Sequence, residues 1–273
     1  MKSIRIGKAE VSRFIVGSNP FSGFSHQTPD MDKRMRHFFT TACIKQTLKD
    51  AEAVGITAVI GRADFHVCRM LMEYWDEGGK LRWLAQTCPE VGAPEVSVDR
   101  AVAYGASGVH VHGGYVDFLL AQGRIEEAVP VVERIHKAGV AAGLAGHNPE
   151  VFRWAEKVKL PVDYYMCSYY NAAHRDKRAE HVSGMSEWFL PEDRKIMTEL
   201  IQDLSKPVIH YKVMAAGRND PRDALRFVVR ALRPGDAVCV GVYTEKKPDM
   251  LAEDVRLFEE ALAAEGKIGR AHV

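Results

Sequence analysis

Short apolar runs alternate with amphipathic stretches along the whole chain. Eight of these runs have the length and composition of buried strands, and they occupy residues 13–18, 56–61, 81–86, 108–112, 140–145, 162–167, 207–212 and 237–242. Each run is followed by a stretch with helical periodicity, for example residues 41–55, 126–139 and 249–266. In the last of these, apolar side chains recur at helical spacing at Leu251, Val255 and Phe258.

Eight strand–helix units in a row predict an α/β fold with a parallel sheet, and eight is the number that closes into a (β/α)8 TIM barrel. Residues 1–12, ahead of the first strand, have the pattern of a small β-hairpin that covers the amino-terminal end of the barrel. No linker or low-complexity segment interrupts the units, so we expect residues 1–273 to form a single domain. The alternative arrangement is an open, doubly wound sheet.

Two of the connections are unusually long. Residues 19–40 follow the first strand and residues 169–190 follow the sixth. Both are connections from a strand to a helix, so both are expected at the carboxyl-terminal face, where barrels carry their active sites. Long loops at this face are typical of lids and substrate walls. The alternative is that they are surface insertions without a functional role.

Composition and charge narrow the range of functions. The formal net charge is +1, which gives no general attraction for nucleic acid or an anionic membrane. The five cysteines lack C-x-x-C spacing, so no disulfide framework is expected. Residues 1–17 lack the apolar core of a signal peptide, and no run of about 18 apolar residues could span a membrane. We expect a cytoplasmic protein with a small-molecule substrate and no nucleic-acid or membrane partner; a homo-oligomer stays open.

Several polar side chains are predicted to converge at the barrel mouth. Side chains on a strand alternate between two faces, so His110 and His112 share the inward face of the fourth strand. The same reasoning turns His210 and Lys212 inward on the seventh strand, with Tyr211 facing the helices. His147 directly follows the fifth strand. We expect His110 to be the deepest and to serve a structural role.

The histidines His112, His147 and His210 form a candidate metal site. Three imidazoles bind Zn, Mn, Fe or Ni and leave a coordination position open for water or substrate. Such a metal polarises a carbonyl group or lowers the pKa of a bound water. Lys212 and Glu90 are the candidates for moving a proton. The alternative is that each histidine is a hydrogen-bonded side chain of the interior.

Three further residues are candidate catalytic groups. Asp64 and His66 follow the second strand, where they either belong to the site or cap the next helix. Tyr169 opens a loop that interleaves aromatic and basic side chains, which suits a polar or anionic small molecule; its other members are Tyr170, His174, Arg175, Lys177 and Arg178. Lys246 and Lys247, after the eighth strand, are a weaker candidate anion site.

Four segments carry a resemblance to a known family. "IRIGKAEVSRFIVGSNPFSG", "AGHNPEVFRWAEKVKLPVDYYMCSYYN", "KPVIHYKVMAAGR" and "VGVYTEKKPDMLAEDV" resemble segments of the aldo-keto reductases, and the likeness covers nearly the whole chain. The resemblance again implies a (β/α)8 barrel. It also implies hydride transfer from NADPH, with a tyrosine as the acid beside an aspartate, a lysine and a histidine.

The chain departs from the family at most of these positions. Ile60 stands where the aspartate belongs and Phe65 where the tyrosine belongs, while Gln86 or Thr87 replaces the lysine. A shifted alignment brings Asp64 to the aspartate position but does not restore the tyrosine. Only the histidine is kept, as His112. In addition, the family's cofactor-binding Ser-Asn pair is replaced by Ala145 and Gly146, and its glutamine by Met166.

These departures lead to three functional hypotheses. The first is a non-redox enzyme that uses the histidine-rich site, with a divalent metal and without NADPH, for hydrolysis, elimination or isomerisation of a small sugar-like or anionic substrate. The second is an NADPH-dependent reductase with a displaced proton donor such as Tyr169 or Tyr115. The third is a non-catalytic sensor of a small molecule. The sequence favours the first.

Overall fold

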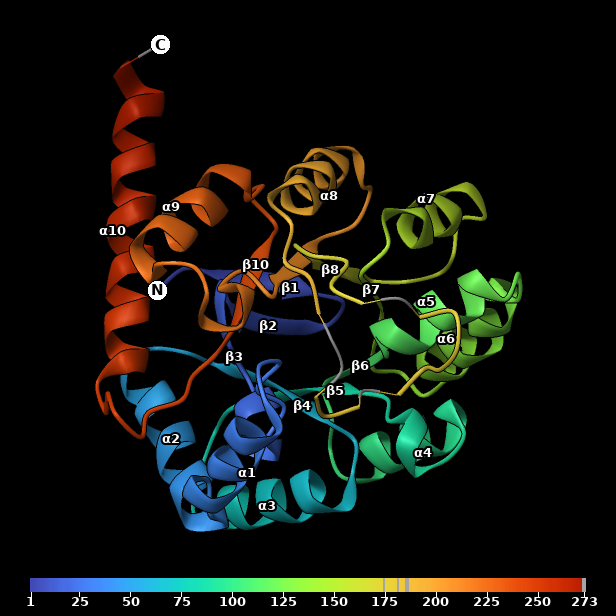
Figure 1. Ribbon diagram of the computed structural model, residues 1–273, viewed down its shortest axis with the longest axis horizontal. Coiled ribbons are helices and arrows are strands. Elements are labelled where there is room, and N and C mark those ends of the chain that lie inside the picture. Colours follow the sequence, from blue (N-terminus) through green and yellow to red (C-terminus); the bar gives the residue numbers. More distant parts are fainter. Residues whose placement is uncertain (174, 181, 185–186, 272–273) are drawn as a thin grey trace.

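Eight parallel strands close into a barrel in the computed structural model, which describes all residues except 174, 181, 185, 186, 272 and 273, and no side chains beyond 265 (Figure 1). The order around the barrel is β10-β3-β4-β5-β6-β7-β8-β9. The bounds are Phe14–Gly17 (β3), Ala58–Arg62 (β4), Arg82–Gln86 (β5), Gly108–Val111 (β6), Ala141–Gly146 (β7), Tyr164–Ser168 (β8), Val208–Tyr211 (β9) and Ala237–Gly241 (β10). The predicted TIM barrel is confirmed.

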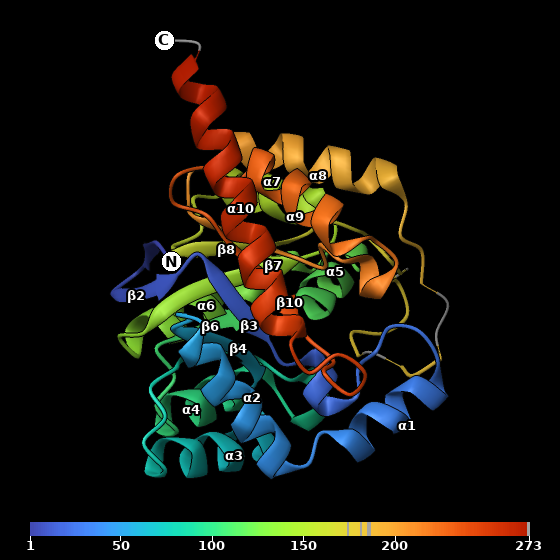
Figure 2. The same ribbon diagram turned by 90° about the vertical axis from the view of Figure 1, so that its left-hand side faces the viewer.

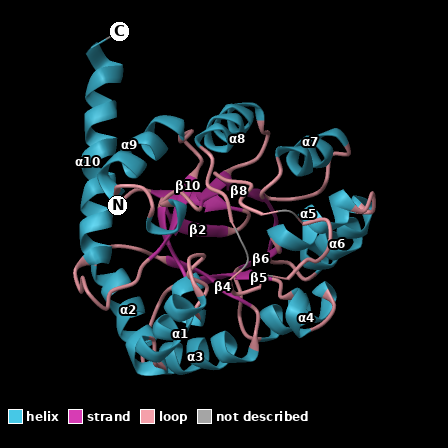
Figure 3. Ribbon diagram, in the orientation of Figure 1, coloured by secondary structure: helices cyan, strands magenta, loops and turns pink. Residues whose placement is uncertain are grey.

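Helices surround the barrel (Figure 3). Their bounds are Pro29–Phe38 (α1), Thr41–Ala53 (α2), Phe65–Asp76 (α3), Pro94–Ala103 (α4), Gly113–Ala121 (α5), Ala128–Lys137 (α6), Pro149–Lys157 (α7), Pro191–Asp203 (α8), Pro221–Ala231 (α9) and Met250–Ala271 (α10). Short 3-10 helices span Asn19–Ser22 (η1), Pro89–Val91 (η2), Ile125–Glu127 (η3) and Ala215–Gly217 (η4). In the described part of the chain, no helix combines the length and apolarity that crossing a bilayer needs.

The amino-terminal hairpin closes one end of the barrel. Strands β1 (Ser3–Ile6) and β2 (Ala9–Ser12) pair antiparallel, as predicted (Figure 2). Their buried side chains Ile4, Ile6 and Val11 pack against the barrel interior, which includes Ala58 and Ala237. These alanines begin β4 and β10, so the hairpin covers the amino-terminal ends of the strands and the mouth lies at the carboxyl-terminal ends.

The strand faces agree with the predicted alternation except on β9. Ile209 and Tyr211 pack with the interior side chains, while Val208 packs with the layer between barrel and helices. The predicted orientation of His210 and Tyr211 is therefore wrong. Apolar residues occupy both faces of this strand, so the pattern alone does not fix its orientation. Buried polar partners decide it, since the imidazole of His210 contacts Asp236 and Tyr169.

Candidate functional site

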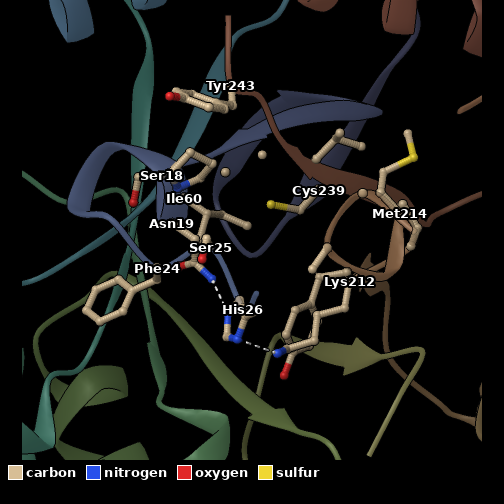
Figure 4. A pocket seen from close by; sticks show the side chains of 18 of the residues that line it. Ser18, Asn19, Phe24, Ser25, His26, Ile60, Lys212, Met214, Cys239 and Tyr243 are labelled. Atoms are coloured by element: carbon tan, nitrogen blue, oxygen red, sulfur yellow. Dashed lines mark hydrogen bonds between the residues drawn. The ribbon is translucent and has the colours of Figure 1, made fainter. Parts of the chain in front are cut away.

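A pocket of ≈ 470 Å³ opens at the carboxyl-terminal ends of the strands (Figure 4). Its inner wall is formed by strand ends that include Ile60, Gln86, Met166 and Cys239. One side is formed by the connection from β3 to α1, and the other by the loops after β9 and β10 together with the start of α10. This is the face at which TIM barrels place ligands.

Lys212 provides the buried amino group of this pocket. It follows β9 with a φ of 57°, a left-handed conformation that interrupts the alternation of the strand. Its side chain is only 10% exposed, and its Nζ lies 4.0 Å from a carboxylate oxygen of Glu187. Burial lowers the pKa of Lys212 to about 8, although Glu187 opposes this shift. Near neutral pH the group is an ammonium that gives up its proton readily.

His26 and Glu187 bring both long connections to Lys212. The amide of Asn19 donates to Nε2 of His26 over 3.3 Å, so Nδ1 carries the proton and donates to Glu187 over 2.8 Å. Nζ of Lys212 lies 3.4 Å from Nδ1 of His26, as Figure 4 shows. His26 belongs to the connection after β3 and Glu187 to the connection after β8, so three distant segments meet at one point. Sequence reasoning missed both residues.

A second contact joins the same two connections. The buried carboxylate of Asp32, in α1, accepts hydrogen bonds from the backbone and hydroxyl of Ser25 and from the hydroxyl of Ser183. The wall of the pocket near Lys212 is therefore held by polar contacts as well as by packing.

Tyr211 forms an aromatic wall of the pocket. Its hydroxyl lies 3.2 Å from Nε2 of His147 and 3.3 Å from the carbonyl oxygen of Gly146. Nδ1 of His147 donates to Asp117 over 2.6 Å, and Asp117 also accepts from the backbone of His147 and Asn148. Burial raises the pKa of Tyr211 well above its ordinary value. The tyrosine is therefore neutral. Its contact with His147, which is itself bonded to Asp117, holds the ring in place.

The predicted metal site is wrong. His112 uses Nδ1 to accept from the backbone of Tyr115 at the start of α5, and His147 is bonded to Asp117. His210 lies between the barrel and the helices. Within the described residues, no group of three or more histidine, cysteine, aspartate or glutamate side chains could hold a metal ion. These histidines satisfy local hydrogen-bonding needs instead.

His110, expected to be structural, lies inside the barrel. Its Nδ1 is 3.1 Å from the hydroxyl of Tyr164, which packs with the interior side chains. Burial lowers the pKa of His110 to about 3. The imidazole is therefore neutral at physiological pH, and its contact with Tyr164 lies away from the residues that line the pocket.

The remaining candidates lie beside the pocket. Asp64 caps α3 by accepting from Val67 and also bonds to Arg62, and Glu90 bonds to Arg62 over 2.9 Å. Of this group only Arg62 lines the pocket.

His66, Tyr169 and the basic loop were also proposed as site groups. His66 is exposed on α3, and the hydroxyl of Tyr169 is bonded to His210. Arg175 is buried, whereas Lys177 and Arg178 are exposed. His174 lies outside the described residues.

The positions of the missing family residues are now visible. Ile60 and Gln86, which the resemblance puts in the places of the aspartate and the lysine, line the pocket. Thr87, the other position offered for the lysine, is buried and accepts a hydrogen bond from the backbone of His112. Phe65, in the place of the tyrosine, begins α3, is 64% exposed and stacks on Arg100. A phenylalanine cannot donate a proton, and this one faces solvent. Phe65 therefore cannot serve as the acid of this site.

The far end of the pocket is acidic. It lies at the start of α10, where Glu253 and Asp254 line it together with Lys247 and Tyr243. Lys247 is ion-paired with Glu253. Asp254 is buried, and burial raises its pKa to about 7. The prediction of an anion site at Lys246 and Lys247 therefore conflicts with the charges that surround Lys247.

Comparison with known proteins supports the fold. No family model matches the chain, and no curated protein matches it. Among solved structures, one similar chain is a Pseudomonas aeruginosa protein assigned to the aldo-keto reductases, with 20% identity, a TM-score of 0.60 and 95% of each chain covered. Another is a Bacillus halodurans aldo-keto reductase in its holo form, with 12% identity, a TM-score of 0.62, and 95% and 91% covered.

A third similar structure is the glycerol dehydrogenase of Gluconobacter oxydans, with 14% identity, a TM-score of 0.59, and 99% and 96% of the two chains covered. At these identities the likeness establishes an aldo-keto-reductase-like barrel and no activity. The prediction of a non-redox, metal-dependent hydrolase, lyase or isomerase is contradicted, because the similar structures are named as a reductase and a dehydrogenase and the described residues offer no metal site. The cofactor prediction, a divalent metal in preference to NADPH, is contradicted with it, since these neighbours are oxidoreductases and the described residues offer no metal site.

Proposed function

We propose that the protein is a nicotinamide-dependent oxidoreductase that interconverts a carbonyl group and an alcohol in a small molecule, with Lys212 as the proton donor. One observation carries the proposal: a single pocket extends from the barrel mouth at Lys212 to the start of α10. A pocket with a reacting group at one end and polar side chains at the other suits a long cofactor with a small substrate beside it.

The pocket residues fit a nicotinamide dinucleotide. Its volume of ≈ 470 Å³ is in the range of cofactor sites. Tyr211 offers a fixed aromatic wall at the mouth, and Asp254 offers a polar group at the start of α10. When bound, the nicotinamide supplies or accepts a hydride. The protein's own task is to bind and orient the two molecules and to move one proton.

Lys212 is suited to moving that proton. Reduction of a carbonyl group needs an acid at the oxygen, and the best acid has a pKa near the working pH. Burial brings the pKa of Lys212 to about 8, so the ammonium is present at neutral pH and donates easily. The carboxylate of Glu187 favours the charged form, and the imidazole of His26 limits where Nζ can lie.

A small, oxygen-rich or anionic substrate suits the mouth. The cations Arg62 and Lys212 both line it, while Phe24 and Phe189 provide apolar wall and contact Arg62 and Lys212, respectively. Arg62 is already paired with Asp64 and Glu90, so a carboxylate or hydroxyl group of a substrate would pair with Lys212 while its carbon skeleton packs on a ring.

Fluorescence titration with NADH and NADPH tests the proposal. We expect saturable binding of at least one of them, followed by its oxidation when small aldehydes or ketones are added. Lys212→Met is expected to retain cofactor binding and to lose turnover. The proposal fails if neither cofactor binds to the folded protein.

A further inference from the structure

The far end of the pocket contains an unpaired, buried acceptor. Asp254 is 4% exposed and lines the pocket. Its Oδ1 is buried, and no group in the described part of the chain donates a hydrogen bond to it. A buried carboxyl oxygen without a donor is unfavourable, and because Asp254 lines the pocket, rotation of its carboxyl group toward the pocket would let a ligand hydroxyl satisfy it.

The charge of this end also points to a particular ligand. The charged side chains that line it are Lys247, Glu253 and Asp254, and Lys247 is already paired with Glu253. With Asp254 ionised, the three sum to a negative charge. A phosphate group placed here would be repelled, whereas a neutral diol would find an acceptor.

We infer that Asp254 binds the adenosine ribose of the cofactor through its hydroxyl groups and makes the protein select NADH over NADPH. The inference rests on the proposed function. The nicotinamide must lie at the mouth, beside Lys212, so the adenosine half extends toward α10. The two cofactors differ only by a phosphate on that ribose. An acidic side chain accepts from the ribose hydroxyl of NAD, whereas a cationic side chain is needed to hold the phosphate of NADP.

Binding measurements on the intact protein test this choice. Dissociation constants for NADH and NADPH are measured by fluorescence titration at pH 8, above the pKa of about 7 of Asp254. We expect NADH to bind roughly tenfold or more tightly than NADPH, the effect of one unfavourable charge contact. Asp254→Asn keeps the size of the side chain and removes its charge. It should therefore tighten NADPH binding and reduce the ratio of the NADPH to the NADH dissociation constant at least threefold.

Two further variants complete the test. Asp254→Ala should weaken NADH binding as well, because it removes the acceptor. Glu259→Gln is the matched control, since Glu259 is exposed on the same helix and does not line the pocket; it should leave both constants unchanged. The inference is overturned if NADPH binds the original protein as tightly as NADH, or if Asp254→Asn leaves the ratio unchanged. Binding of neither cofactor overturns the proposed function and this inference together.

Discussion

Two groups of the same three residue types differ in their access to the pocket. In one, the hydroxyl of Tyr211 contacts His147, which donates to Asp117. In the other, the hydroxyl of Tyr169 contacts His210, which contacts Asp236.

The first group presents its tyrosine ring to the pocket, and the second is enclosed between barrel and helices. The residue types of a hydrogen-bonded group therefore do not by themselves identify a functional site. The accessible tyrosine is the one that can influence a ligand, and the enclosed group contributes to stability.

The largest expected effect comes from the enclosed group. Asp236→Ala removes a carboxylate that accepts hydrogen bonds from Val208, Arg233 and His210. Because Arg233 and His210 lose their buried carboxylate partner and keep only neutral ones, we expect a loss of about 3–5 kcal/mol in the free energy of unfolding, measured by urea denaturation. Cofactor affinity of the folded fraction should not change; a large change would mean that the two groups are coupled.

Replacement of the pocket lysine should act on turnover instead. Lys212→Met is expected to lower kcat for carbonyl reduction by roughly 100-fold or more, the usual contribution of an acid. Stability should be unchanged or higher, since a buried cation is replaced by an apolar side chain. Lys246→Met is the control, because Lys246 is exposed on the loop after β10. An equal decrease in kcat in the two variants would argue against Lys212 as the proton donor.

The pH dependence of turnover should identify the same group. Lys212 has a pKa of about 8, and only its protonated form donates. Carbonyl reduction should therefore be level below pH 8 and fall about tenfold for each pH unit above it. The alcohol oxidation that runs in reverse needs the neutral amine and should rise over the same interval. A rate profile for Lys212→Met that still bends near pH 8 would assign the ionisation to another group.

A pair of tyrosine substitutions gives the smallest and most direct contrast. Tyr169→Phe leaves Nδ1 of His210 without its donor and should cost about 1–3 kcal/mol of stability, with cofactor affinity unchanged. Tyr211→Phe frees the ring at the pocket and should weaken NADH binding roughly 2- to 10-fold. Thermal unfolding and fluorescence titration on both variants measure the two quantities. If both substitutions changed stability and NADH affinity by the same amounts, the position of each tyrosine relative to the pocket would not explain its role.

The barrel could be predicted because its strands are continuous apolar runs. Each predicted strand agrees with the observed one to within two residues at either end, for example residues 81–86 against Arg82–Gln86 for β5. The helix α1 was not foreseen inside the connection 19–40. Its signals were present, since Thr28 caps it, Pro29 begins it, and Asp30 and Asp32 fill its first turn.

The site was harder to predict than the fold. Lys212 was chosen by strand alternation, yet a left-handed backbone conformation puts it in the pocket. His26 and Glu187 are 161 residues apart, and nothing local in either connection indicates that they meet. The preference of β9 for one orientation depends on Asp236, which belongs to a different segment. Contacts between distant segments carry this information, and a single sequence does not reveal them.

The amino-terminal hairpin has a kinetic consequence. With Ile4, Ile6 and Val11 filling the amino-terminal end, the cofactor and the substrate of the proposed reaction share one entrance. A molecule that occupies the inner part of a cavity with one entrance must enter before, and leave after, the molecule that covers it. We therefore expect compulsory-order kinetics, visible as competitive product inhibition for one reactant only, and a turnover rate governed by departure of the last molecule to leave.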